Sequence, residues 1–155
     1  MSIKGHLPFS LVVVLCCGSV ASLAAGGTPE GAPCLAYGPA STVLTGRLQL
    51  ESRFGPPNYG EDPLTDKKVM VPMLHLVSAV DVCAERGDEI NVHTYRGIWV
   101  VQLAPADSVD PQLAGKNVRV VGQLYEAQFA HDYTRVTLTV DSIVAVLDPT
   151  GVHPM

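Results

Sequence analysis

The chain has 155 residues and a formal net charge of −5, from 10 Lys and Arg against 15 Asp and Glu. This length suits one domain built around one hydrophobic core. The acidic balance argues against nucleic acid as a partner, because binding to nucleic acid depends on cationic side chains that neutralise phosphates.

Residues 1–24 have the layout of a secretory signal peptide. Lys4 precedes the apolar run LVVVLCCGSVASLAAGG, and its small residues predict cleavage after Ala24. The run is shorter than the roughly 20 apolar residues that a membrane span needs. A lipoprotein is not expected, because no small residue directly precedes Cys16 or Cys17. We therefore expect a periplasmic or secreted protein without a membrane span after signal cleavage.

Two cysteines, Cys34 and Cys83, remain after cleavage. An oxidising compartment favours a disulfide between them, and the alternative is two separately buried thiols. The bond would close a loop of about 50 residues and stabilise the fold by about 4 kcal/mol in the chain-entropy model. We expect residues 25–33 to be a flexible lead-in, residues 34–147 to form the domain, and residues 148–155 to be a flexible tail.

The first three strands are predicted from alternation and from the residues that interrupt it. Val43–Glu51 alternates apolar and polar residues and is predicted to be a half-buried strand. Lys67–Val80 contains Pro72, which cannot donate to a strand ladder, so this strand should be at an edge or bulged. The third region, 91–104, is interrupted by Gly97, which suggests a bulge or a close backbone approach.

The second half of the domain contains one predicted short helix and two more strands. Residues 105–116 are the only helical candidate, with Asp107 or Ser108 as the cap. Strands are predicted at 116–127 and at 134–146, and the apolar positions of the last shift by one near Asp141, which predicts a bulge. We therefore expect an all-β domain, a five-stranded OB-like Greek-key barrel with one short helix between strands three and four. A β-sandwich or an irregular five-stranded sheet is the alternative.

Several blocks of the chain resemble, in order, those of a family of small secreted bacterial proteins known as a domain of unknown function. They are CLAYGPASTVLTGRL, FGPPNYGED, LHLVSAVDVC, VVQL, LAGKNVRVVGQLYEAQFAH and TLTV, of which GPPNY and GK-x-V-x-V-x-G-x-L are the most specific. The resemblance covers nearly all of residues 34–140 and implies a secreted compartment, a disulfide and an OB-like fold, without an established activity. The family carries a run of histidines in its last loop, where this chain keeps only His131 and Thr134.

Two loops are candidates for a binding surface. RFGPPNYGEDPLTDKK, residues 53–68, joins the first two predicted strands, and in OB-folds this loop and the one between strands four and five frame the binding face. Asn58 and Gly60 tolerate left-handed backbone, which leaves Tyr59 without a role in the turn. We expect binding residues at Tyr59, Asn58, Phe129, His131 and Tyr133. The alternative is that Tyr59 packs onto the end of the barrel and pins the loop.

A set of three histidines and a set of three arginines each have a functional and a simpler structural interpretation. His75, His93 and His131 could ligate zinc or copper if the fold brought them together, but single strand histidines are usually packed or half-exposed side chains. Neither a metal nor a cofactor is expected. Arg47, Arg119 and Arg135 could form a patch for an acidic glycan or partner, and a solvated outer face is the simpler interpretation.

Motifs that mark common enzyme classes are missing from the chain. There is no G-x-S-x-G, H-E-x-x-H, C-x-x-C or phosphate-binding glycine loop, and we do not expect an enzyme. The sequence favours a secreted or periplasmic binding or protein-interaction module, with another envelope protein, a foreign protein or an envelope glycan as its partner. A metal-binding or envelope-stress protein is the first alternative, and an unrecognised hydrolase is the second.

Overall fold

The computed structural model describes residues 34–147. The predicted signal peptide at 1–24, the lead-in at 25–33 and the tail at 148–155 lie outside the described residues. Within residues 34–147, no helix is long and apolar enough to cross a membrane.

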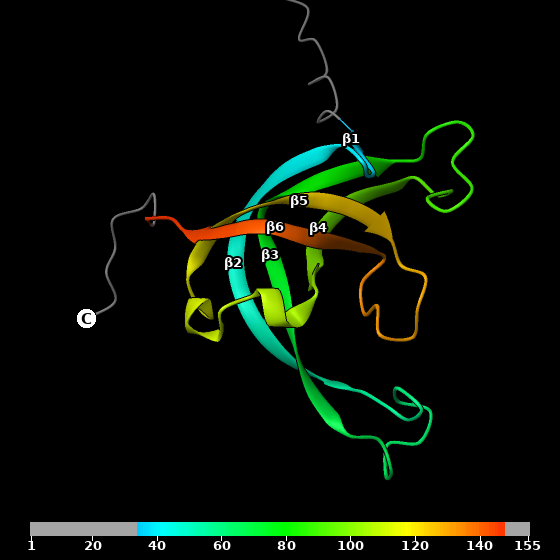
Figure 1. Cartoon of the computed structure of the whole chain (residues 1–155), viewed down its shortest axis with the longest axis vertical. Helices are drawn as coiled ribbons and strands as arrows, with labels where there is room; N and C mark the ends of the chain where they lie inside the picture. The colour runs from blue at the N-terminus through cyan, green and yellow to red at the C-terminus, as the bar shows by residue number, and fades with distance from the viewer. Residues whose placement is uncertain (1–33, 148–155) are drawn as a thin grey trace, which may run out of the picture. The chain divides into compact units, whose positions relative to one another are not determined.

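The described residues form an all-β structure with one mixed sheet of six strands. The strands are β1 (Leu35–Ala36), β2 (Ser41–Phe54), β3 (Lys68–Cys83), β4 (Tyr95–Ala104), β5 (Asn117–Glu126) and β6 (Val136–Ala145). Their order is β1-β3-β2-β5-β6-β4, and β3 also pairs with β4. Each of the five long strands therefore has two long neighbours, and the pairing is partly ring-like (Figure 1). The sixth strand, β1, was not predicted, because two residues are too few for a detectable alternation.

The short helix predicted between the third and fourth long strands is not observed. Two three-residue 3-10 turns, η1 (Ala106–Ser108) and η2 (Pro111–Leu113), occupy this connection. Neither Asp107 nor Ser108 is a cap; instead the side chain of Asp110 accepts a hydrogen bond from the Gln112 N–H and caps η2. Pro111 is unfavourable inside a helix, because it lacks an N–H and its ring clashes with the preceding turn, so a helix is not expected to run through it. The short pieces before Pro111 and from Pro111 onward form 3-10 turns. Val109 lies between the turns and is buried in the core, so the connection covers one side of it.

The hydrophobic core includes the inward-facing residues that alternation predicted in β2, β5 and β6, together with residues from β3, β4 and two connections. Leu44 and Leu48 of β2 are buried, and Leu50 is half-buried toward the end of the same strand. Burial of apolar side chains from all five long strands supplies the main stabilising term. The other members of the core are Tyr37, Leu74, Leu76, Val82, Val101, Leu103, Val109, Val118, Val120, Leu124, Val136 and Leu138.

Bulges and glycines allow the strands to bend, as predicted. The β5–β6 register skips Asp141, which is the expected bulge. The β3–β4 register shifts between Ile98 and Tyr95, and Gly97 lies there with a φ of 65°. A Cβ on Gly122 would lie 2.0 Å from the Thr139 carbonyl oxygen, so β5 and β6 approach more closely than any side chain allows.

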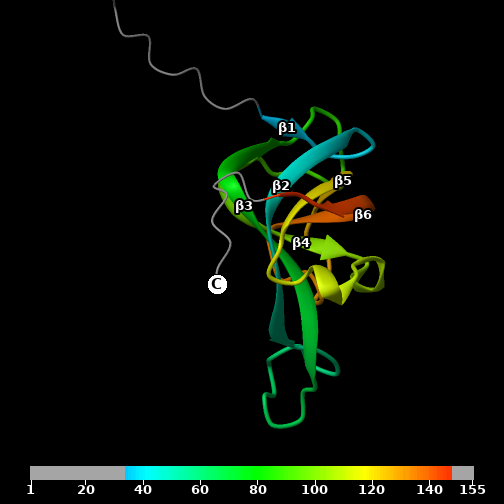
Figure 2. The ribbon, with the colours of Figure 1, turned by 90° about the vertical axis from the view of Figure 1, so that its left-hand side faces the viewer.

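The strand that contains Pro72 is an edge over its first residues, Lys68–Pro72. Residues before Met73 pair with β2 only, because the ladder to β4 begins at Met73 and Gln102. The predicted edge position of Pro72 is therefore confirmed. Figures 1 and 2 show the result: β2 and β3 continue beyond the other strands as a two-stranded hairpin, with the loop at 55–67 at its end.

The predicted disulfide between Cys34 and Cys83 is present. The two Cα atoms are 5.7 Å apart, and β1 pairs in parallel with the end of β3 beside the bond. The adjacent Tyr37 is buried, and its hydroxyl donates to the His93 carbonyl oxygen at 2.9 Å. The disulfide and Tyr37 together fix the start of the domain to the sheet.

Candidate functional site

A groove of about 500 Å³ lies between the two loops that were predicted to bind. Tyr59 comes from the 55–67 loop, while His131 and Tyr133 come from the loop between β5 and β6. The unpaired edge of β3 and the end of β4 complete the walls. The remaining lining residues are Pro56, Val69, Met70, Val71, Gln102, Ala104, Pro105, Ala106 and Thr139. The lining is therefore mainly apolar, and Met70 is 57% exposed within it. We call it the loop groove.

The 55–67 loop is organised by a buried carboxylate, Asp66. Its two oxygens accept hydrogen bonds from the backbone N–H of Asn58 at 2.8 Å and of Gly60 at 2.6 Å. Burial opposes ionisation of Asp66, but these backbone donors outweigh it and lower the pKa of this carboxyl. The residue between the two donors is Tyr59, so Asp66 holds the backbone on both sides of it.

Tyr59 has a left-handed backbone, with a φ of 56°. This conformation is rare for an aromatic residue and costs about 1 kcal/mol or more. The expected left-handed residues were Asn58 and Gly60; the structure has Tyr59 and Gly60 instead. Strain of this kind persists only where neighbouring interactions enforce it, and it often marks binding sites. The hydrogen bonds of Asp66 enforce it here.

The opposite wall of the loop groove is held by Gln102 and Tyr133. The Gln102 side chain donates to the His131 carbonyl oxygen at 3.0 Å and accepts from the Tyr133 N–H at 2.7 Å. The Tyr133 hydroxyl donates to the carbonyl oxygen of Phe54 at 2.6 Å, which joins this loop to the hairpin. Burial, and then the nearby Tyr59, raise the pKa of the Tyr133 phenol. Both walls are thus fixed before any ligand binds.

The structure brings together three of the five predicted binding residues. Tyr59, His131 and Tyr133 line the loop groove, whereas Asn58 and Phe129 do not. Phe129 is 66% exposed and stacks on His131, with ring centroids 5.2 Å apart. Tyr59 is half-buried, so it is neither packed completely onto the domain nor free in solvent.

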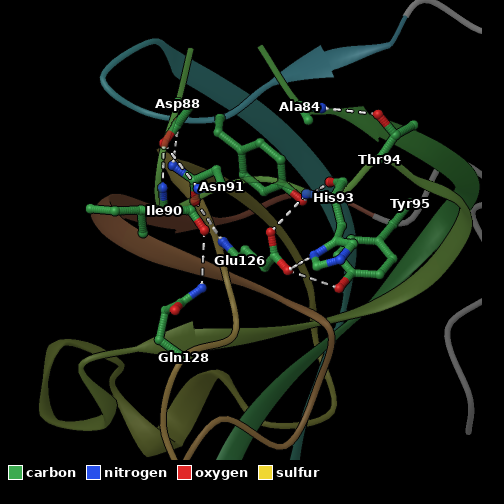
Figure 3. Close-up of polar contacts among 10 residues, drawn as sticks. Ala84, Asp88, Ile90, Asn91, His93, Thr94, Tyr95, Glu126 and Gln128 are labelled. Atoms are coloured by element: carbon green, nitrogen blue, oxygen red, sulfur yellow. Dashed lines mark hydrogen bonds and ion pairs between the residues drawn. The ribbon is translucent and has the colours of Figure 1, made fainter. Parts of the chain in front are cut away.

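A second buried carboxylate, Glu126, lies at the end of β5 (Figure 3). It accepts hydrogen bonds from the His93 N–H at 3.0 Å, from the His93 ring nitrogen Nδ1 at 2.5 Å and from the Tyr95 hydroxyl at 3.1 Å. Its own N–H donates to Asn91 Oδ1, and Asn91 in turn donates to Asp88. These contacts attach the β3–β4 loop to β5.

The charge of Glu126 is stabilised by these donors. Burial raises the pKa of a carboxyl, but the hydrogen bonds from His93 and Tyr95 outweigh this and lower the pKa of Glu126. The same burial and the bond to Glu126 raise the pKa of the Tyr95 phenol. A buried carboxylate that aligns an exposed imidazole resembles a general-base pair, but among the described residues the His93 ring is hydrogen-bonded only to Glu126 and to no nucleophile.

The three histidines considered as metal ligands are not brought together. His75 contacts Glu51, with 2.7 Å between Nε2 and Oε1, while His93 contacts Glu126 and His131 stacks on Phe129. Within residues 34–147, no three His, Cys, Asp or Glu side chains are grouped so that they could hold a metal ion.

The three arginines considered as a patch do not form one patch. Arg47 and Arg119 lie near each other on the paired strands β2 and β5. Arg135 precedes Val136, which pairs with the end of β5, whereas Arg119 pairs with Val144 near the other end of β6. Arg135 therefore lies at the opposite end of β6 from Arg119.

Sequence reasoning missed both buried carboxylates. Glu126 had a detectable signal, because it continues the inward-facing series Val118, Val120, Gly122 and Leu124 at every second residue. A carboxylate at such a position must find hydrogen-bond donors. Asp66 had no comparable signal, since its loop has no periodicity.

No protein-family model matches the chain, and no curated protein matches it.

Proposed function

We propose that the protein is a secreted or periplasmic binding module with an OB-like Greek-key barrel. Support for the barrel comes from the order in which the five long strands pair, β3-β2-β5-β6-β4, with β4 returning to β3. The 3-10 turns between β4 and β5 take the place of the OB helix. The apolar run at residues 11–27 and the disulfide are compatible with an oxidising compartment.

The observation that carries the function is the loop groove itself. It is walled by the two loops that form the binding face in OB-folds, and it exposes aromatic rings on a rigid frame. The polar groups of Gln102 are already used within the wall. An envelope or foreign protein that inserts an apolar side chain therefore fits the groove better than a glycan, which needs many hydrogen bonds.

Site-specific photo-crosslinking tests this function. A photoreactive phenylalanine analogue replaces Met70 in the groove or, as a matched control, Val144 on β6, since the two residues are 57% and 53% exposed. Irradiation in the native envelope should give a discrete protein adduct from position 70 and none from position 144. The same adduct from both positions, or none from position 70, would contradict a docking role for the groove.

A second variant separates binding from folding. Tyr59→Ala in the position-70 protein should remove most of the adduct, because an aromatic anchor carries much of the binding free energy, while the melting temperature stays within a few degrees of the parent. If Tyr59 mainly packs the hairpin, the change destabilises the fold by about 2 to 4 kcal/mol instead. Adduct yield and thermal unfolding, measured on the same preparation, distinguish the two results.

A further inference from the structure

A second groove, of about 340 Å³, lies along the first half of β4. It exists because β4 joins β6 only from Gln102 onward, so residues 133–135 pass the earlier part of β4 without pairing to it. Five of its lining side chains carry its chemistry: Tyr95, Arg96, Trp99, Tyr133 and Arg135. We call it the β4 groove.

Trp99 supplies a flat apolar surface in the β4 groove. It is the only tryptophan of the chain, and 58% of it is exposed on β4. Tryptophan is the side chain that gains most from burial, so an exposed one on a strand is a preferred contact in recognition surfaces. An isolated exposed apolar residue is common on protein surfaces, however, so the side chains around Trp99 decide whether it belongs to a binding surface.

Two arginines, Arg96 and Arg135, line the β4 groove together with Trp99. Arg96 donates from one nitrogen to Asp81 at 2.9 Å, and its side chain is 76% exposed. Asp81 also accepts from the Gly97 N–H at 2.8 Å, which fixes the bulge that projects Arg96 outward. The Arg135 guanidinium carbon lies 5.7 Å from the centre of the Tyr95 ring. Within residues 34–147, Arg135 forms no ion pair.

The β4 groove has one cation, Arg135, that no carboxylate pairs among residues 34–147. Asp81 pairs with Arg96, although no carboxylate is among the lining residues themselves. Guanidinium groups bind carboxylates through paired hydrogen bonds in a fixed plane. The β4 groove therefore combines the unpaired Arg135 and the exposed Arg96 with an aromatic platform between β4 and the segment before β6.

We propose that the β4 groove binds an acidic oligosaccharide. The apolar face of one sugar-acid ring lies on Trp99, and its carboxylate is bound by Arg135 and Arg96. Strands two and three of an OB-like barrel, here β3 and β4, form a surface suited to oligosaccharides. This site is separate from the proposed protein-binding role of the loop groove, and the two share only Tyr133 as a wall.

The other anionic polymers fit the β4 groove less well. Strand addition by a peptide needs a straight free edge, and the bulge at Gly97 interrupts the edge of β4. Single-stranded nucleic acid needs a track of cations along many phosphates, whereas this groove has two arginines in an acidic protein.

Trp99 fluorescence gives a direct test, because no other tryptophan contributes to the signal. The probe is a tetramer of galacturonic acid, with the fully methyl-esterified tetramer as its uncharged match. The acidic tetramer should change the emission of Trp99 saturably, and esterification should weaken binding by about tenfold or more, since the charge-assisted hydrogen bonds are lost.

Variants locate the binding. Arg135→Gln should weaken binding of the acidic tetramer by about tenfold. Arg119→Gln removes the same charge at the other end of β6 and should leave binding unchanged, as should Tyr59→Ala in the loop groove. The proposal is overturned if emission does not change saturably, or if Arg119→Gln weakens binding as much as Arg135→Gln. It is also overturned if tetraglutamate or a short oligothymidylate binds as tightly as the sugar acid.

Discussion

At the scale of single residues, two buried carboxylates hold the loops of this domain in place. Asp66 fixes the backbone on both sides of the strained Tyr59. Glu126 attaches the β3–β4 loop to the end of β5 through His93 and Tyr95. Each charge is buried among hydrogen-bond donors, which compensates the cost of removing it from water. The loops beside the two grooves are therefore held by ionised groups that do not line either groove.

Glu126→Gln should destabilise the protein at neutral pH by about 1 to 3 kcal/mol, because the buried donors lose a charged acceptor. Urea unfolding measures the effect. Glu89→Gln is the matched control. Glu89 is an exposed carboxylate of the β3–β4 loop, which Glu126 contacts, and its side chain forms no hydrogen bond among residues 34–147. This control should have the same urea midpoint as the parent.

The effect of Glu126→Gln should depend on pH in one direction. The pKa of Glu126 is lower in the folded protein than its usual value of 4.5, so the ionised carboxylate stabilises the fold above pH 4.5. That contribution is lost as pH falls through the lowered pKa, because the protonated group resembles the amide. The stability difference between parent and variant should therefore shrink in acid. A constant difference down to the acid transition would contradict this role of the charge.

At the scale of the elements, glycines and bulges decide how the strands bend. Gly46 of β2 and Gly122 of β5 lie where a Cβ would meet a carbonyl oxygen of the neighbouring strand, at 2.3 and 2.0 Å. The bulge at Asp141 lies in β6 directly opposite Gly122. Close approach and bulging at one place bend β5 and β6 together, and strands that bend in this way can pair on both sides.

Gly122→Ala should destabilise the fold by about 1 to 3 kcal/mol or more, because the Thr139 carbonyl oxygen belongs to a ladder and cannot move freely. Gly97→Ala is the contrasting variant. A Cβ there meets nothing within 4 Å, and only its positive φ costs free energy, about 1 kcal/mol. In thermal unfolding, Gly122→Ala should have a lower melting temperature than Gly97→Ala. The reverse order would show that the β5–β6 approach is not tight.

At the scale of the whole domain, one covalent bond joins the start of the described residues to the end of β3. Cys34 and Cys83 are separated by 49 positions, and the enclosed segment contains all of β2, most of β3 and the protruding hairpin. The bond restricts the unfolded chain over this whole segment. It also holds β1 and Tyr37 against the sheet.

Reduction should lower the melting temperature by more than about 10 °C, since closing a loop of this length contributes about 4 kcal/mol in the chain-entropy model. The protein purified without reductant should contain no free thiol at Cys34 or Cys83. A Cys34→Ser, Cys83→Ser double variant should have the melting temperature of the reduced protein. Adding reductant should not change it further. Equal melting temperatures for reduced and oxidised protein would contradict a stabilising role of the bond.

Local patterns in the sequence were sufficient to predict where the five long strands lie, the bulges at Gly97 and Asp141, and that Pro72 is at an edge or a bulge. Alternation reports which face of a strand is buried, and proline and glycine report breaks in a ladder, so each of these features is written within a few neighbouring residues. The pairing of Cys34 with Cys83 was predicted differently, because only these two cysteines follow the predicted signal peptide. The two-residue strand β1 and the 3-10 turns were not predicted, because they are too short to show a period.

The candidate sites were predicted only in part, because local sequence patterns show some of their residues and not others. Aromatic residues in two loops indicated the wall residues Tyr59, His131 and Tyr133, because a loop aromatic without a turn role is visible in sequence. The lining of one groove by Arg96, Trp99 and Arg135, and the contact of His93 with Glu126, join residues more than 30 positions apart. Their proximity follows from strand register and from where β4 and β6 separate. Both depend on long-range packing free energy, which no local stretch of sequence contains.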